Sequence, residues 1–101
     1  MARTPESKVK ARIVRLLKKY GAYYFFPQTG GYGSSGIPDI IICYYGLFIA
    51  IECKAGNNKP TALQKLQLEK IVAAEGIATV VNEKNIGDVE ELLITIRTLF
   101  G

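Results

Sequence analysis

The chain has 101 residues, 49% of them hydrophobic, and a formal net charge of +4 at neutral pH. This length and apolar content suit one globular domain whose core needs no disulfide framework. No apolar run approaches the roughly 18 residues of a membrane span, and no signal peptide is evident, so we expect a soluble intracellular protein, cytoplasmic or nucleoid-associated. Two cysteines and no histidine exclude imidazole catalysis and the common zinc sites.

The first predicted element is an amphipathic helix near the N-terminus. Thr4 suits the N-cap, Pro5 suits the first helical position, and Gly21 ends the segment. Between them, apolar residues recur at helical spacing, namely Val9, Ile13, Leu16, Leu17 and Tyr20.

The same helix concentrates basic charge. Residues 1–19 carry seven basic side chains against a single acid, Glu6. Four of the basic residues follow one helix face at spacings of three and four, namely Lys8, Arg12, Arg15 and Lys19. Two interpretations stay open: an ordinary solvated face, or contacts with DNA phosphates.

An aromatic, β-prone segment, Ala22 to Phe26, predicts a strand, and the glycine-rich residues 27–36 predict a loop after it. Near-continuous apolar runs at residues 39–44 and 47–54 predict a hairpin of two strands buried on both faces, with Gly46 in the turn. Cys43 and Cys53 lie in these runs. We expect both to be reduced core thiols on opposite faces of the hairpin.

A second helix is predicted to open at Pro60 and Thr61, and Gly76 stands where a glycine cap would end it. Its apolar residues are Leu63, Leu66, Ile71 and Val72. Residues 77–81 predict another strand, and residues 86–100 a third helix. The predicted order of elements is therefore αβββαβα.

Three polar residues stand out in the apolar hairpin: Asp39, Glu52 and Lys54. If the chain turns tightly at Tyr45 and Gly46, Asp39 faces Glu52 with their Cβ atoms roughly 4.5–5.5 Å apart. Glu52 and Lys54 are two residues apart on a strand and so project from the same face. Tyr45 is unfavourable in a type I′ turn, and a longer turn would shift this register.

Two facing carboxylates repel each other unless a cation lies between them. Carboxylate oxygens suit Mg²⁺ or Mn²⁺, which would polarise a phosphate and lower the pKa of a bound water. Lys54 beside such an ion would orient the nucleophile or stabilise the transition state. Acids and lysines at strand ends are commonly only solvated. The preceding Gly-Ile-Pro sequence at residues 36–38 makes the catalytic interpretation the stronger one.

The motifs GIPD at residues 36–39 and FIAIECK at residues 48–54 resemble those of PD-(D/E)XK nucleases, and more closely of the VRR-NUC family. The resemblance spans roughly residues 6–81. It implies a single VRR-NUC-like nuclease domain over residues 1–101, with a restriction-endonuclease-like αβββαβ core, a mixed sheet flanked by helices, and an additional C-terminal helix. It further implies a Mg²⁺- or Mn²⁺-dependent endodeoxyribonuclease.

By this resemblance, Asp39, Glu52 and the backbone carbonyl of Cys53 are metal ligands, and Lys54 is the catalytic lysine. Glu6 matches an acid that can assist metal binding, although it could serve only the helix dipole. Gln64 matches the family's catalytic glutamine, although with Thr61 it also forms a capping-box pattern.

Stand-alone members of the family resemble Holliday-junction resolvases that act as homodimers. The resemblance thus implies branched DNA, such as a four-way junction, as the substrate, and no membrane partner. Because symmetric resolution needs two active sites, a C2 homodimer is the natural form for so short a chain. Two alternatives stay open: a non-catalytic DNA-binding or assembly module that keeps the nuclease fold, and a sequence-specific nicking or restriction-type endonuclease.

Overall fold

The computed structural model describes residues 4–28 and 36–101, so most of the predicted glycine-rich loop lies outside the described residues. The elements are α1 (Pro5–Tyr20), β1 (Tyr23–Phe25), β2 (Ile40–Tyr44), β3 (Leu47–Cys53), α2 (Ala62–Ala73), β4 (Ile77–Val81) and α3 (Gly87–Phe100). The predicted order is confirmed. Within the described ranges, no helix is both long and apolar enough to cross a membrane.

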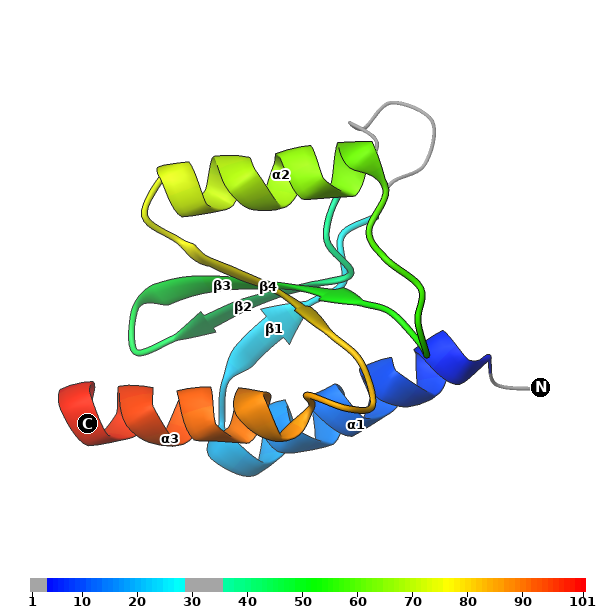
Figure 1. The fold of residues 1–101 in the computed structure, drawn as a ribbon. Helices are drawn as coiled ribbons and strands as arrows, with labels where there is room; N and C mark the ends of the chain where they lie inside the picture. Colours follow the sequence, from blue (N-terminus) through cyan, green and yellow to red (C-terminus); the bar gives the residue numbers. More distant parts are fainter. Residues whose placement is uncertain (1–3, 29–35) are drawn as a thin grey trace.

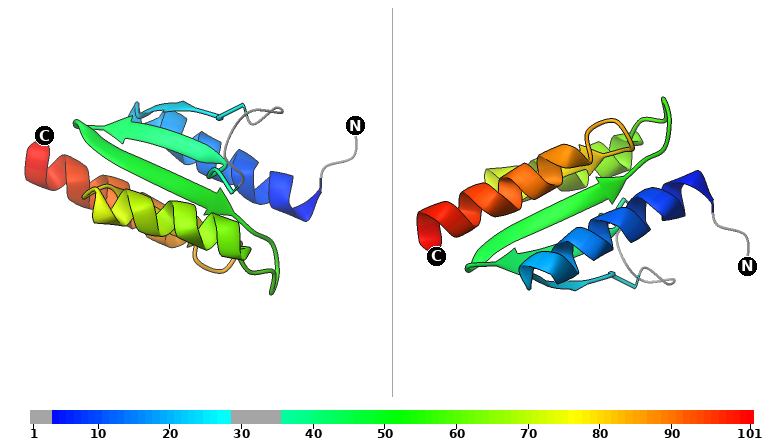
Figure 2. Two further views of the ribbon diagram at one scale, coloured as in Figure 1. Left: turned by 90° about the horizontal axis from the view of Figure 1, so that it is seen from above. Right: turned by 90° about the horizontal axis from the view of Figure 1, so that it is seen from below.

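The strands form one four-stranded sheet in the order β1-β2-β3-β4. β1, β2 and β3 pair antiparallel, whereas β4 pairs parallel with β3. The helix α2 lies on one face of the sheet, and α1 and α3 lie together on the other (Figure 1 and Figure 2). This is the predicted α/β architecture, a mixed sheet flanked by helices.

The helix α1 forms as its end signals predict. The hydroxyl of Thr4 accepts a hydrogen bond from the backbone N–H of Ser7 at 3.0 Å, and Gly21 ends the helix in the left-handed region with φ 72°. Its apolar stripe is buried against the sheet through Val9, Ile13 and Leu17. This packing directs the first turn of α1 toward one end of the sheet.

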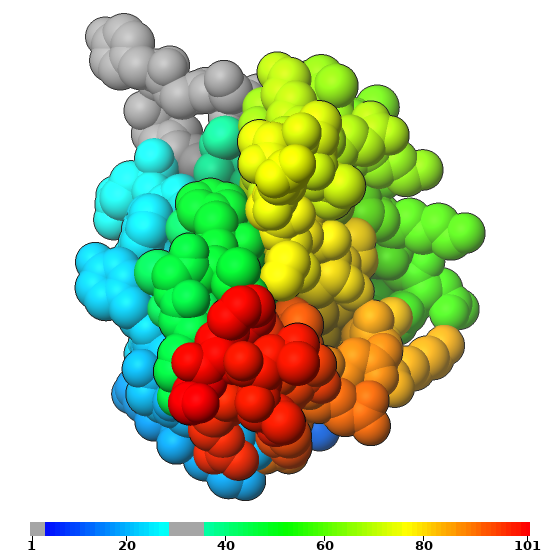
Figure 3. All heavy atoms as spheres, turned by 90° about the vertical axis from the view of Figure 1, so that its left-hand side faces the viewer, coloured from blue at the N-terminus to red at the C-terminus, as the bar shows by residue number. Residues whose placement is uncertain are grey.

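The β2–β3 hairpin closes in the tight turn on which the facing acids depend. Tyr45 has φ 51° and Gly46 has φ 79°, both positive as a type I′ turn requires. The register runs from Tyr44 opposite Leu47 to Ile40 opposite Ile51, which is the predicted register. Figure 3 views the turn end of the molecule, where the hairpin meets the C-terminal end of α3.

The helix α2 turns a different side to the sheet than its apolar residues predict. Leu63, Leu66 and Val72 are exposed, and α2 has no fully buried side chain. Its half-buried residues are Gln64, Gln67, Leu68 and Ile71, which share one helix face at helical spacing. Because two of those four are glutamines, the periodicity of leucine and valine does not mark the buried side.

Part of the sheet face that carries α2 stays open, because α2 packs against β4 and β3. On this open part lie the exposed side chains of Tyr23, Phe25, Cys43 and Phe48. The prediction of a core thiol is therefore wrong for Cys43, although Cys53 is buried among α1 and α3 contacts as expected. The register places the two sulfurs on opposite faces, and both thiols are free.

The predicted glycine cap of α2 is also displaced by one residue. Glu75, rather than Gly76, adopts the left-handed conformation, with φ 71°. The N–H groups of Glu75 and Gly76 donate to the carbonyls of Val72 and Ile71, each at 2.9 Å, which is the Schellman pattern. Gly76 is needed for space, since a Cβ there would lie 2.8 Å from Ile71 Cγ2.

We expect Glu75→Gly to raise the free energy of unfolding by about 1 kcal/mol, because glycine adopts positive φ without the steric cost that glutamate meets. Urea denaturation followed by circular dichroism measures the change. Gly76→Ala serves as the contrasting variant and should destabilise the fold through its contact with Ile71. An unchanged or lower stability of Glu75→Gly would show that the cap is not strained.

Candidate active site

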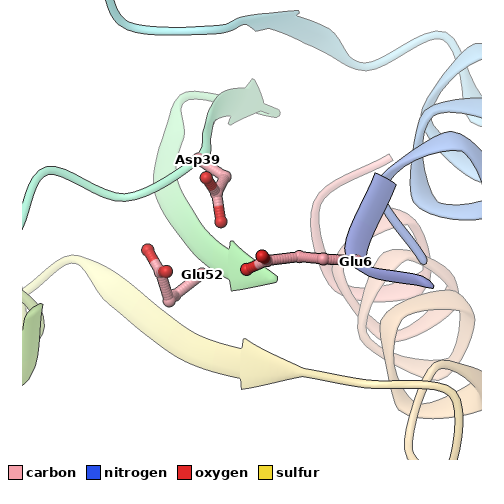
Figure 4. Close-up of side chains that lie close together, drawn as sticks. All are labelled: Glu6, Asp39 and Glu52. Carbon is pink, nitrogen blue, oxygen red and sulfur yellow. The ribbon is translucent and has the colours of Figure 1, made fainter. Parts of the chain in front are cut away.

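Three carboxylates from distant parts of the chain meet at one end of the sheet. Glu6 lies in the first turn of α1, Asp39 directly precedes β2, and Glu52 lies near the end of β3. One oxygen of each lies within 4.8 Å of those of the other two. Figure 4 shows the three side chains pointing toward one another. The hairpin register brings Asp39 and Glu52 together, and the docking of α1 adds Glu6.

Asp39 is held in place by the end of the neighbouring strand. The backbone N–H of Cys53 donates to Asp39 Oδ2 at 2.7 Å. This bond extends the hairpin beyond its last paired residues, Ile40 and Ile51. The N–H and C=O of one strand residue point to the same side, so the Cys53 carbonyl is directed toward Asp39 as well. Its role as a metal ligand stays a prediction, which this orientation favours.

Glu52 is a buried carboxylate with an incomplete set of partners. Its side chain is 2% exposed, and its Oε1 atom has no hydrogen-bond partner among the described residues. Burial, and then the charge of Asp39, raise the pKa of Glu52 to about 7 against the opposing effect of Lys54. A buried carboxylate without partners is costly. The site therefore suits a cation that would bind this oxygen.

Lys54 lies between two of the acids on the predicted face. Its Nζ atom is 3.4 Å from Glu52 Oε2 and 3.9 Å from Glu6 Oε1. The three carboxylates and this one ammonium group sum to a formal charge of −2 when all are ionised (−3 + 1). An all-oxygen cluster of that charge fits a hard divalent ion such as Mg²⁺ or Mn²⁺.

The glycine of the GIPD motif is explained by packing against α2. Gly36 has φ 82°, and a Cβ added to it would lie 2.5 Å from the carbonyl carbon of Leu63 and 2.7 Å from the N atom of Gln64. The chain that leads into Asp39 thus rests directly on the first turn of α2. Only glycine satisfies both the positive φ and this close approach.

We expect Gly36→Ala to lower the free energy of unfolding by about 2–4 kcal/mol, since it adds overpacking to the cost of a left-handed alanine. Gly46→Ala is the matched control, because Gly46 has φ 79° but none of the described residues lies within 4 Å of an added Cβ. The control should lose only about 1–2 kcal/mol. Equal losses in urea denaturation would contradict the proposed role of the contact with α2.

The predicted capping box of α2 is present. The N–H of Thr61 donates to Gln64 Oε1 at 2.9 Å, and the N–H of Gln64 donates to Thr61 Oγ1 at 3.2 Å. The capping role of Gln64 is therefore observed. Its catalytic role stays a prediction.

The four predicted DNA-binding residues, Lys8, Arg12, Arg15 and Lys19, are all exposed on α1. The Nζ atom of Lys19 forms an ion pair with Glu90 Oε2 at 2.8 Å, and this contact joins α1 to α3. Arg12, Arg15 and Lys19 line a cleft of about 300 Å³ beside the start of α3. At 1.5 Å per residue, Lys19 lies about 20 Å from Glu6 along the helix. Contact of these residues with DNA stays a prediction.

One residue near the acids carried no sequence signal. Lys10 lies one helical turn beyond Glu6, and its Nζ atom is 4.0 Å from the centre of the Phe26 ring. It does not belong to the predicted basic face. Only the docking of α1 over the end of β1 shows that this cation is near the site.

No family model and no curated protein matches the sequence. One solved structure, described as a VRR-NUC domain, is similar with a TM-score of 0.69 and 17% identity, covering 98% of this chain and 100% of that one. Another, described as a VRR-NUC domain protein, has a TM-score of 0.64 and 22% identity, covering 100% of this chain and 93% of that one. At these identities the likeness concerns the fold. The fold that the motif resemblance implied is confirmed: this chain has the α/β fold of the solved VRR-NUC domains.

Proposed function

We propose that this chain is a metal-dependent DNA endonuclease that hydrolyses phosphodiester bonds at Asp39, Glu52 and Lys54. The observation that carries the proposal is the acid cluster, in which the buried Glu52 oxygen lacks a partner among the described residues. The cluster lies in a fold shared with solved VRR-NUC domains. Residues 1–101 then act as one nuclease domain, and a DNA substrate implies an intracellular, cytoplasmic or nucleoid-associated protein.

The proposed metal ligands are Asp39, Glu52 and the carbonyl of Cys53, with Glu6 as an additional ligand. The hydrogen bond from Cys53 fixes Asp39, and burial fixes Glu52, so both carboxylates are oriented before any ion binds. When bound, Mg²⁺ or Mn²⁺ supplies Lewis-acid polarisation of a phosphate and lowers the pKa of water. Oriented ligands of this kind lose little conformational entropy on binding.

Lys54 provides the positive charge on the protein side of the reaction. Its side chain is only 14% exposed, and it is oriented by the carboxylates of Glu52 and Glu6. From this position its ammonium group orients the attacking nucleophile or stabilises the charge that develops on the phosphate. Gln64 is a proposed auxiliary catalytic residue, and Lys8, Arg12, Arg15 and Lys19 are proposed phosphate contacts.

The proposed substrate is branched DNA, with a four-way junction cut by a homodimer in the manner of a Holliday-junction resolvase. A C2 dimer presents two active sites, as symmetric cleavage requires. The aromatic side chains of Tyr23, Phe25 and Phe48 are exposed on the part of the sheet that α2 does not cover. They offer apolar surface of the kind that interfaces bury. Sedimentation of the purified protein tests the dimer.

The central experiment incubates the protein with a four-way junction and with a linear duplex of the same sequence, in Mg²⁺, in Mn²⁺ or in EDTA. We expect cleavage of the junction only when metal is present. Failure to cleave any DNA, or full activity in Asp39→Ala, would refute the nuclease.

Two other outcomes identify the alternatives. Junction binding without cleavage, unaffected by metal and by Lys54→Ala, indicates a non-catalytic assembly module. Cuts at a defined sequence in the linear duplex indicate a nicking or restriction-type enzyme. Mapping of the cut positions separates the second outcome from junction resolution.

A further inference from the structure

A polar cleft lies beside the acid cluster at the end of the sheet. Because β3 and β4 are parallel, the loops after them, residues 54–61 and 82–86, leave the same edge. Between these loops is a cleft of about 460 Å³, within the range of about 300–1,000 Å³ that small-molecule sites occupy. Its polar lining comes from Asn57, Asn58, Lys59, Asn82 and Lys84. We call it the Lys59–Lys84 cleft.

The cleft is adjacent to Glu52 through the strand pairing. Val80, which also lines the cleft, is the register partner of Glu52. Partners in a parallel pair project to the same face of the sheet, so Val80 and Glu52 are neighbours there. The backbone N–H of Lys54 donates to the carbonyl of Val81 at 3.0 Å. The cleft therefore lies on the side of Glu52 that faces β4.

The two loops are joined by hydrogen bonds, so the cleft is built before a ligand enters. The N–H of Gly56 donates to the carboxylate of Glu83, and Lys84 Nζ donates to Asn57 Oδ1 at 3.3 Å. The Oδ1 atom of Asn82 accepts from the N–H of Lys84 at 2.8 Å. Such preorganisation lowers the entropy cost of binding.

The charge of the cleft complements that of the acid cluster. Lys59 and Lys84 provide two cations, and the one acid in residues 54–61 and 82–86, Glu83, is engaged by the N–H of Gly56. The asparagine amides add both donors and acceptors. The acid cluster, with its formal negative charge, repels a DNA backbone in the absence of metal. A cationic, amide-rich cleft next to it supplies the missing attraction.

We propose that the Lys59–Lys84 cleft is a nucleotide subsite, which holds the nucleotide next to the phosphodiester bond that is cut. In it, Lys59 and Lys84 contact the phosphate, and Asn58 and Asn82 contact the sugar or base. This inference rests on the proposed nuclease function and adds the path of the cut strand across β3 and β4. The subsite is a positioning element that binds substrate without taking part in the chemistry.

The first test measures binding of a fluorescent four-way junction, in Mg²⁺, by the Asp39→Asn protein, which should not cut it. Lys59→Ala/Lys84→Ala is compared with Lys18→Ala/Lys70→Ala, which removes the same charge from the last turns of α1 and α2. We expect the cleft variant to bind about 10–100-fold more weakly and the slope of log K against log salt to fall by about 2. The control should change neither quantity.

Lys59→Gln/Lys84→Gln is included because it removes the charges and keeps most of the side-chain length. A thermal melt of every variant shows whether it is folded. Equal binding losses in the cleft and control variants would overturn the subsite, as would absence of DNA binding. If the cleft variant alone binds weakly and no DNA is cut under any condition, the nuclease fails and with it the position of the subsite beside a cut bond, and the cleft is then a DNA contact only. If DNA is cut and the variants bind alike, the nuclease stands and the subsite fails.

The second test, once the cut is mapped, shortens the cut strand to end, without a terminal phosphate, at the nucleotide beside the cut on either side, which removes the outer phosphate that Lys59 and Lys84 are proposed to contact. The wild-type protein should show a raised KM for one of the two shortened strands and little change in kcat. The cleft variant should be indifferent to that same shortening, since it has already lost the contact. If the effects of the cleft variant and of the shortening on KM simply added for both shortened strands, the assignment would be contradicted.

Discussion

Replacing Asp39 by asparagine is expected to slow metal-dependent cleavage of junction DNA by about a thousandfold, which corresponds to about 4 kcal/mol of transition-state stabilisation. Asparagine keeps the size of the side chain and an oxygen that can accept the hydrogen bond of Cys53 N–H, now 2.7 Å long. It loses the negative charge that binds a divalent ion. The measurement is the single-turnover cleavage rate over a series of Mg²⁺ concentrations, with calorimetry of metal binding beside it.

Glu6→Gln is the matched control for this prediction. Glu6 has a half-exposed side chain and lies at the far edge of the cluster, so we expect a smaller loss, about tenfold. Both variants should melt in EDTA at least as high as the wild type, because each removes one of three mutually repelling acids. A rate for Asp39→Asn within tenfold of the wild type would contradict its role as a ligand.

The metal-free protein is expected to lose stability as the pH rises from about 5 to about 7. The pKa of Glu52 is about 7 in the fold against an ordinary value of 4.5, raised first by burial and then by Asp39. A carboxyl whose pKa is raised by folding contributes stability below pH 4.5 and loses it as the pH rises through the folded value. A pKa raised this far corresponds to a loss on the order of a few kcal/mol.

Glu52→Gln tests this prediction directly. In EDTA, the free energy of unfolding of the wild type should fall between pH 5 and pH 8, whereas that of the variant should change much less. At pH 8 the variant should be more stable by up to about 3 kcal/mol, although it is expected to be inactive. Mg²⁺ should restore the stability of the wild type at pH 8 and leave the variant unchanged. If the wild type and Glu52→Gln lost stability in parallel as the pH rises, the buried charge of Glu52 could not be the cause of the loss.

Much of the fold is predictable from the sequence because its signals are local. End signals such as Thr4, Gly21 and the Thr61 capping box act within one helical turn, and each is present in the structure. The hairpin register follows from a tight turn and the alternation of a strand, so the meeting of Asp39 and Glu52 is predictable as well. Tyr45 adopts positive φ despite its side chain, which shows that the paired strands outweigh the cost at one turn residue.

The features that local patterns do not predict depend on which element covers which surface. Leu63 and Leu66 are apolar but exposed, because the sheet meets the glutamine-bearing side of α2. Cys43 sits in an apolar run but faces the part of the sheet that α2 does not cover. Hydrophobic periodicity reports the composition of a face and not its partner.

The same distinction holds within the site. Glu6 joins the other two acids only because α1 docks on the sheet. In the sequence, only the resemblance to the VRR-NUC family pointed to this residue. The Lys59–Lys84 cleft has no motif at all, because its two loops become neighbours only when β4 pairs parallel with β3. Parallel pairing links segments that are far apart in the chain, and no short pattern encodes it.

The arrangement of the acid cluster depends on the turn at Tyr45 and Gly46, which no substrate needs to contact. Glu52 lies six residue steps along the chain from Gly46, about 20 Å at 3.3 Å each. Side chains alternate along a strand, so one inserted turn residue would rotate Glu52 and Lys54 into the core beneath α1 and α3 and bring Ile51 and Cys53 round in their place. The register of the hairpin thus decides whether Glu52 and Lys54 meet the other two acids or enter the apolar core. Insertions and deletions at that distant tip should act like changes in the catalytic residues themselves.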